Sequence, residues 1–202
     1  MPRVVGQIDI AKNEAILDAA VEVLSERGVS GPIEEIARRA SVSKQTIYNH
    51  YGSKAELVRA LCERRVAEMT AVFDAPDAVE HPEEALAQFA RVLLRAVLEP
   101  GRFTIMRMAM LGAVDMPEIG QAMFEAGPRA SRRRLAEFIA LEAAAGRLAA
   151  PDPMQAAEFF AGMVIGSFQM GALLGLDPVI DDARADAIAR EAAARFMRAY
   201  AP

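Results

Sequence analysis

The sequence has little of the chemistry on which secreted proteins and metalloproteins depend. It holds one cysteine, two histidines and no tryptophan in 202 residues. The single Cys62 excludes an internal disulfide, and a reducing cytoplasm is the expected compartment. His50 and His81 are too few and too widely separated for a metal site, so we expect no metal and no cofactor. The first residues contain no continuous apolar run, which argues against a secretion signal.

Recognisable catalytic patterns are also missing, although an enzyme is a competing reading. We find no glycine-rich phosphate loop and no nucleophile placed at a recognisable spacing from a base. Ser131 and Ser167, for example, have no histidine nearby in sequence. The sequence therefore predicts a protein that is not an enzyme.

What the chain does contain is helix-forming sequence. Apolar residues make up 53% of it, which rules out a disordered protein, and Ala, Leu, Glu and Arg are abundant. We expect an all-α fold of about nine helices. The net charge is −5, but residues 38–59 carry five basic side chains against Glu56 alone. This pattern favours one positive surface on an acidic body, although such a cluster can also be an ordinary solvated helix face.

The most informative segment runs from Ile33 to Tyr51 and reads as two short helices joined by a tight turn. Apolar residues at helical spacing give the first helix one buried stripe. Ser43 is placed to cap the second helix, because its hydroxyl can accept a free backbone N–H. Ile47 and Tyr51, four residues apart, face the first helix. The polar residues left on the second helix are suited to base edges and phosphates of DNA.

Glycine and proline divide the rest of the chain into further helices. We expect a first helix from Ile10 to Arg27, a long helix capped by Ser53 and Glu56, and a series of helices in the body. The body helices are expected at residues 83–98, 103–113, 117–126, 127–145, 154–174 and 181–200. The predicted domains are a DNA-binding domain at residues 1–55 and an effector-binding and dimerisation domain at residues 56–202.

This order of elements resembles the TetR/AcrR family of bacterial transcriptional regulators. The resemblance is specific within residues 10–60, where it rests on the Ala15–Ala20 run, Ile36-Ala37, Val42-Ser43-Lys44, Thr46-Ile47-Tyr48 and Ser53–Leu57. The body matches by helix order and is similar to the AefR-like branch. The turn position that commonly holds glycine is Ser41, which predicts slight strain if the turn is left-handed.

The resemblance implies a helix-turn-helix domain, a homodimer and a body that responds to a ligand and usually represses transcription. At matching positions Thr46, Tyr48 and Lys54 resemble the phosphate contacts of the family. From their chemistry, Lys44, Gln45 and Asn49 are the best candidates for base edges. The full predicted DNA-binding set is Ser43, Lys44, Gln45, Thr46, Tyr48, Asn49, His50 and Lys54. His50 has an alternative role, packing beside Tyr51.

The segment from Phe159 to Leu176 carries no charge and permits two readings. Its length approaches that of a membrane span, and Gly162 and Gly166 have the spacing of packed membrane helices. However, the segment contains four glycines and the next helix is amphipathic, which favours a helical dimer interface over a membrane-associated protein. The predicted interface residues are Phe159, Gly162, Gly166, Met170, Ile188, Ala192 and Phe196.

The middle helices are the predicted site of a small, largely apolar effector whose identity is unknown. Methionine and phenylalanine suit an adaptable pocket, although such a stripe is more often plain core. The predicted lining is Phe103, Met106, Met110, Leu111, Met123, Phe124, Phe160 and Met163. Together these features predict a homodimeric repressor that binds a double-stranded, palindromic operator in the cytoplasm, associates with the nucleoid when bound and has no membrane partner. A DNA-binding architectural protein without an effector is the alternative.

Overall fold

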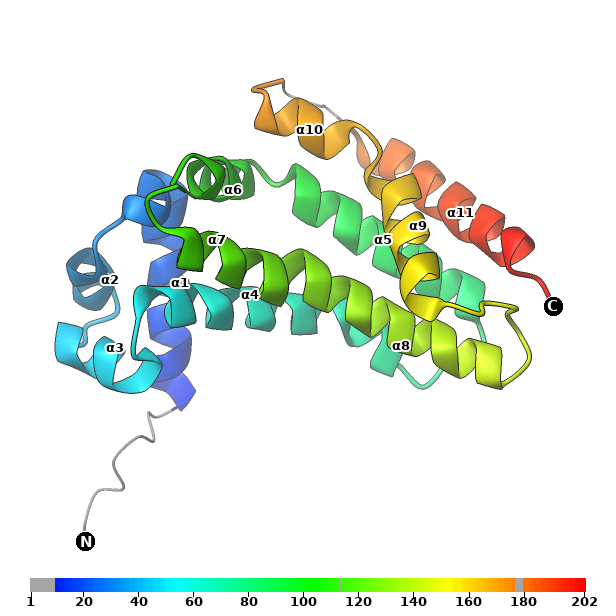
Figure 1. The fold of residues 1–202 in the computed structure, drawn as a ribbon, viewed down its shortest axis with the longest axis horizontal. Coiled ribbons are helices and arrows are strands. Elements are labelled where there is room, and N and C mark those ends of the chain that lie inside the picture. The colour runs from blue at the N-terminus through cyan, green and yellow to red at the C-terminus, as the bar shows by residue number, and fades with distance from the viewer. Residues whose placement is uncertain (1–9, 113, 177–179) are drawn as a thin grey trace, which may run out of the picture. The chain divides into compact units, whose positions relative to one another are not determined.

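The structure is a computed structural model that describes residues 10–112, 114–176 and 180–202, including all their side chains except those of residues 100–104 and 108. Every regular element in these ranges is helical, which confirms the all-α prediction (Figure 1). The described chain forms two compact units. The first contains residues 1–64 and 104–127, and the second contains residues 65–103 and 128–202. This division differs from the predicted boundary after residue 55.

The first unit contains the helix-turn-helix. Helix α1 spans Ile10–Arg27, α2 spans Ile33–Arg39 and α3 spans Lys44–Tyr51. Their apolar faces form one cluster that includes Ile16, Ile36 and Ile47, all at most 1% exposed. Helix α4, Lys54–Thr70, contributes Leu57 to this cluster. The core residues thus fix α3 from its inner side and leave its outer side free.

A second cluster in the first unit involves α6, Pro100–Gly112, and α7, Pro117–Phe124. Ala109 and Ile119 from these helices pack with Leu24 of α1 and Val58 of α4. Residues 104–127 therefore belong with the N-terminal helices by packing, although they are distant in sequence.

The second unit is built around α5, Pro82–Leu98, and α11, Asp182–Ala199. These two helices lie side by side although 83 residues lie between them in the chain (Figure 1). Helix α8, Ala130–Ala144, packs against α9, Pro153–Ile165. The ring of Phe160 lies 5.3 Å from Phe196 and 6.4 Å from Phe89, measured between ring centroids, so α5, α9 and α11 share one aromatic core.

The single helix predicted at residues 154–174 is wrong. The chain forms α9 and then a separate short helix, α10, Phe168–Leu173. Gly166 takes a positive φ of 49°, a conformation that ends a right-handed helix and costs glycine little. Within the described residues, no helix is both long and apolar enough to span a membrane.

Two predicted helix boundaries are also wrong. Gly127-Pro128 does not separate two helices, because a π-helical turn, Glu125–Arg129, joins α7 to α8 with Pro128 inside it. The wider turn accommodates a residue that has no N–H to donate. The helix expected from Phe103 begins instead at Pro100, directly after the extended residue Glu99. A proline is well tolerated at a first helical position, where its missing N–H has no helical partner to lose.

Candidate nucleic-acid interface

The turn between α2 and α3 sets the direction of the candidate recognition helix. Ser41 adopts the left-handed conformation that its place in the turn predicted, with a φ of 54°. Ser43 then caps α3, as predicted, and its Oγ accepts the backbone N–H of Thr46 at 3.0 Å. The hydroxyl oxygens of Ser43 and Thr46 also lie 2.8 Å apart at the start of the helix. The first turn of α3 is therefore held by side chains and needs no DNA to form.

The last turn of α3 is anchored to α1 through Asn13, a residue that sequence analysis did not single out. The side-chain oxygen of Asn13 accepts the Tyr51 hydroxyl at 2.6 Å and lies 3.1 Å from His50 Nε2. The His50 and Tyr51 rings meet edge to face at 4.5 Å, as the alternative packing role of His50 predicted. Burial raises the pKa of Tyr51 to about 12, so its hydroxyl stays protonated at neutral pH.

The outer face of α3 presents the polar side chains predicted to read DNA. Lys44, Gln45, Tyr48 and Asn49 are all exposed. Gln45 Nε2 donates to Asn49 Oδ1 at 2.7 Å, so the two amides lie one helical turn apart on a single face. Amides in this arrangement suit adenine edges in a major groove.

Lys44 lies at the first position of α3 and already has two neighbours. Its ammonium donates to Glu34 of α2 and lies 5.6 Å from the centre of the Tyr48 ring. The hydrogen bond raises the pKa of Lys44 and lowers the pKa of Glu34. Both groups are therefore fully charged near neutral pH.

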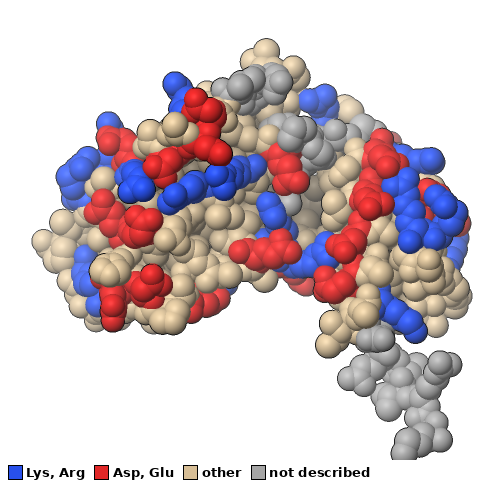
Figure 2. Space-filling view, turned by 180° about the vertical axis from the view of Figure 1, so that it is seen from behind, with Lys and Arg blue, Asp and Glu red and all other residues tan. Residues whose placement is uncertain are grey.

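The basic side chains of residues 38–59, which predicted a positive surface, are largely paired with acids. Arg39 binds Glu22, Glu26 and Glu35 with contacts of 2.6–3.3 Å, and Arg38 binds Glu35 at 2.7 Å. The acids come from α1 and α2, outside the stretch used for that prediction. Residues 10–64 as a whole hold eight basic and eight acidic side chains. On the face drawn in Figure 2, basic and acidic side chains are accordingly interspersed.

Lys54 occupies the start of α4, where a phosphate contact was predicted. Its ammonium donates to the backbone oxygen of Gly31 at 2.6 Å and is half-buried. This bond ties the start of α4 to the loop before α2, and burial lowers the pKa of Lys54. One of the three N–H donors is thereby used within the protein. Ser53 accepts the backbone N–H of Glu56 at 3.2 Å, which confirms the Ser53 part of the predicted cap, whereas the Glu56 carboxylate accepts from Arg59 Nε at 3.2 Å.

The residues predicted for a dimer interface fall into two groups. Phe159 and Met170 are 57% and 58% exposed, and Gly162 and Gly166 are exposed beside them in sequence. In contrast, Ala192 and Phe196 of α11 are buried in the core of the second unit against α5 of the same chain. Ile188 is partly buried against the same core. The stripe on α11 therefore packs inside one subunit, and the expectation that it packs against a partner is wrong for Ala192 and Phe196.

The residues predicted to line an effector pocket divide between the two units. In the first unit Met110, Leu111 and Phe124 are 60%, 69% and 58% exposed, whereas Met106 and Met123 are partly buried. In the second unit Phe160 is fully buried and Met163 is 42% exposed. The side chain of Phe103 lies outside the described part of the structure. The predicted lining stays a prediction.

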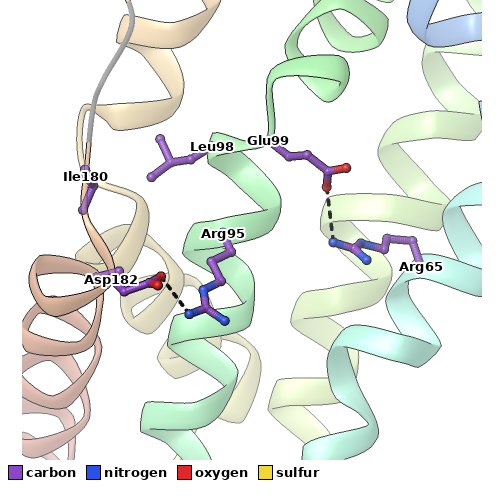
Figure 3. Close-up of a pocket in the computed structure, with 7 residues that line it drawn as sticks. Arg65, Arg95, Leu98, Glu99, Ile180 and Asp182 are labelled. Carbon is purple, nitrogen blue, oxygen red and sulfur yellow. Dashed lines mark hydrogen bonds and ion pairs between the residues drawn. The ribbon is translucent and has the colours of Figure 1, made fainter.

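A pocket that sequence analysis missed lies within the second unit. It has a volume of about 330 Å³ and is lined by Arg65, Arg95, Leu98, Glu99, Ile180, Asp182 and Ala185. Two ion pairs frame it: Arg95 points to Asp182 at 2.8 Å and Arg65 to Glu99 at 3.5 Å (Figure 3). Its residues come from α4, the end of α5 and the beginning of α11, which only the fold brings together.

Comparisons with known proteins match both parts of the chain. Residues 16–61 match the family described as bacterial regulatory proteins of the tetR family. Residues 84–202 match the C-terminal domain of the AefR-like transcriptional repressors. Together the two matches cover the helix-turn-helix and most of the body.

Relatives and solved structures agree with these family matches. A helix-turn-helix-type transcriptional repressor of Mycobacterium tuberculosis is 34% identical over 86 residues, which is 42% of this chain and 46% of that protein. The match thus spans less than half the length of this curated relative. The flavonoid-responsive regulator FrrA is 28% identical, with a TM-score of 0.71 over 95% of this chain and 97% of that one. A TetR-family regulator from Mesorhizobium loti has the same fold, with a TM-score of 0.76 at 23% identity over 96% of this chain and 100% of that one.

Proposed function

The chain belongs to the TetR family of bacterial transcriptional regulators, and we propose that it binds a palindromic operator as a homodimer and is released by a small effector. The exposed face of α3 carries this proposal. Lys44, Gln45 and Asn49 lie there on a helix whose ends are fixed by Ser43 and by the Asn13 contacts. A fixed helix that exposes amides and a cation is what direct readout of a major groove requires.

The exposed apolar residues of α9 support the homodimer. Gly162 and Met163 lie three and four residues after Phe159, so the three share one face of α9, and all three are exposed in the single chain. The exposed Gly166 follows at the end of this helix. Small residues between large ones let helices of two subunits approach closely. Two copies of α3 would then enter successive major grooves about 34–36 Å apart, which predicts two related half-sites.

Repression is supported by the relatives. The C-terminal match is to a repressor family, and the relative from Mycobacterium tuberculosis is named a repressor. A shorter match, 46% identical over 52 residues and a quarter of this chain, is to the activator FasR of Mycolicibacterium smegmatis and covers 24% of that protein. Since the repressor match includes the body that would receive the effector, we propose repression with release by ligand.

The pocket between α4, α5 and α11 is a candidate effector site beside the predicted lining. Its volume lies at the lower end of the range for ligand pockets. Arg65 and Arg95 can donate to an acidic or hydrogen-bond-accepting group, while Leu98 and Ile180 offer apolar contact. A relative named for its response to flavonoids supports a small organic effector. An architectural DNA-binding protein, the alternative, would show no ligand-dependent loss of binding.

Selection of duplexes from a random library, followed by footprinting, tests the DNA-binding proposal. We expect two symmetric protected half-sites and, for Gln45→Ala, a change in the preferred bases. Gln88→Ala on α5 is the matched control, since it removes an exposed amide from the body and should leave the preference unchanged. If the wild-type protein selects no sequence and retains no duplex at low salt, the proposed function is wrong.

A further inference from the structure

Glu34 is an acidic residue in direct contact with the proposed DNA-reading surface. It lies in the first turn of α2, and its carboxylate accepts a hydrogen bond from Lys44 at the beginning of α3. The Glu34 and Lys44 side chains are 60% and 51% exposed, so water and DNA can reach both. The most prominent cation on the candidate recognition helix is therefore paired before any DNA arrives.

Two of the other nearby cations, Arg38 and Arg39, are themselves paired with acids of α1 and α2. Lys54 donates to the neutral backbone oxygen of Gly31 and keeps its charge. A helix-turn-helix with balanced charge gains little from the phosphate backbone alone, and that attraction supplies most non-specific affinity. The contact between Glu34 and Lys44 can therefore change the ratio of specific to non-specific DNA affinity.

We propose that Glu34 is a positioning residue that sets operator specificity by holding Lys44. This inference rests on the proposed function, because it assumes that α3 reads DNA. Glu34 competes with phosphates for the ammonium and directs it along the outer face of α3, toward the base edges. Only a base edge that offers good acceptors, such as guanine O6 and N7, compensates for the weakened ion pair between Glu34 and Lys44.

The expected effect is moderate because both partners are exposed. Exposed ion pairs are weak and salt-dependent, so a phosphate can displace Glu34 but does so at a cost. Removing the carboxylate frees one cation for any duplex. The slope of log affinity against log salt should then become steeper by up to about one.

The test compares wild-type, Glu34→Gln, Lys44→Met and the double variant on two duplexes. One duplex is selected from a random library by the wild-type protein, and the other has the same bases in scrambled order. Glu34→Gln should raise affinity for the scrambled duplex about three- to ten-fold, and the ratio of selected to scrambled affinity should fall by a similar factor. In the Lys44→Met background the same substitution should change affinity less than about two-fold, because Glu34 acts through Lys44.

Glu56→Gln is the matched control. It also removes one paired acid from the first unit, but its partner Arg59 lies on α4 rather than on α3. It should leave the affinity ratio unchanged. The inference is overturned if Glu34→Gln leaves the ratio at its wild-type value, or if its effect is as large without Lys44. Failure of the wild-type protein to select any duplex would instead refute the proposed function.

Discussion

Lys54 serves the fold and, in the proposed function, the DNA as well. Its bond to the Gly31 oxygen uses one N–H and holds the loop before α2 against the start of α4. The remaining donors lie beside the first turn of α4, where free backbone N–H groups and the helix dipole also favour an anion. A structural tie of this kind would keep the ammonium in place for a phosphate.

Lys54→Met should therefore have two separable effects. Loss of the charge should weaken binding to selected and scrambled duplexes alike and reduce the salt slope by about one. Loss of the hydrogen bond should lower the free energy of unfolding by about 1.5 kcal/mol. Lys54→Arg keeps the charge and should retain the wild-type salt slope. An unchanged slope for Lys54→Met in a salt titration would show that the residue has only a structural role.

At single residues, sequence analysis succeeded where the determining interaction is local. The Ser43 cap and the burial of Ile47 follow from residues three or four positions away, and the left-handed Ser41 occupies the turn position where the family resemblance places glycine. The roles of Glu34 and Asn13 depend on contacts between helices ten to thirty-eight residues apart. A count of charges along residues 38–59 could not include acids that only the fold brings near.

Helix α2 is held by a network centred on Glu35. Its carboxylate accepts from Arg38 at 2.7 Å and from Arg39 at 3.0 Å, and Arg39 continues the network to Glu26 of α1. These hydrogen bonds lower the pKa of Glu35 to about 2, well below its usual value near 4.5. The charged form is thus favoured in the folded protein, and the network links α1 to the helix-turn-helix.

This pKa predicts how the first unit responds to acid. Above pH 4.5 the carboxylate is ionised in both states, and the stabilisation is fully present. Between pH 4.5 and about 2 the unfolded chain takes up a proton that folded Glu35 does not, so stability falls as the pH falls. Glu35→Gln should be less stable at neutral pH and should lose less stability over this interval. Urea unfolding measured at several pH values tests this. An equal fall in stability between pH 4.5 and about 2 in the wild type and in Glu35→Gln would contradict this prediction.

Among elements, the helix types were predictable but several boundaries were not. Proline and glycine mark most helix boundaries, yet Pro100 begins a helix, Pro128 lies inside a helical turn and Gly166 lies between two helices. A glycine at position 166 is compatible with a continuous small-residue face and with a break. Its backbone conformation decides between them, and that depends on how α9 and α10 pack.

The homodimer interface of the whole molecule depends on which apolar side chains are buried within one subunit and which are left exposed. From sequence periodicity, the apolar residues of α9 and α11 were both predicted to lie in the dimer interface. An apolar stripe has the same spacing whether it packs against the same chain or against another. The structure assigns Phe196 to the core of the second unit and leaves Phe159 exposed. A homodimer would therefore be held by α9 rather than by the buried stripe of α11.

Phe159→Asp and Phe196→Ala should consequently fail in different ways. Phe196→Ala removes a fully buried ring and should lower the free energy of unfolding by about 3–5 kcal/mol. Phe159→Asp places a charge on the proposed interface and should leave folded monomers in sedimentation, with weakened operator binding, because two half-sites can no longer be held together. Val79→Asp, at another exposed apolar residue of the second unit, is the matched control and should remain dimeric. If Phe159→Asp sediments as the wild-type dimer, the proposed interface on α9 is wrong even if operator binding by α3 holds.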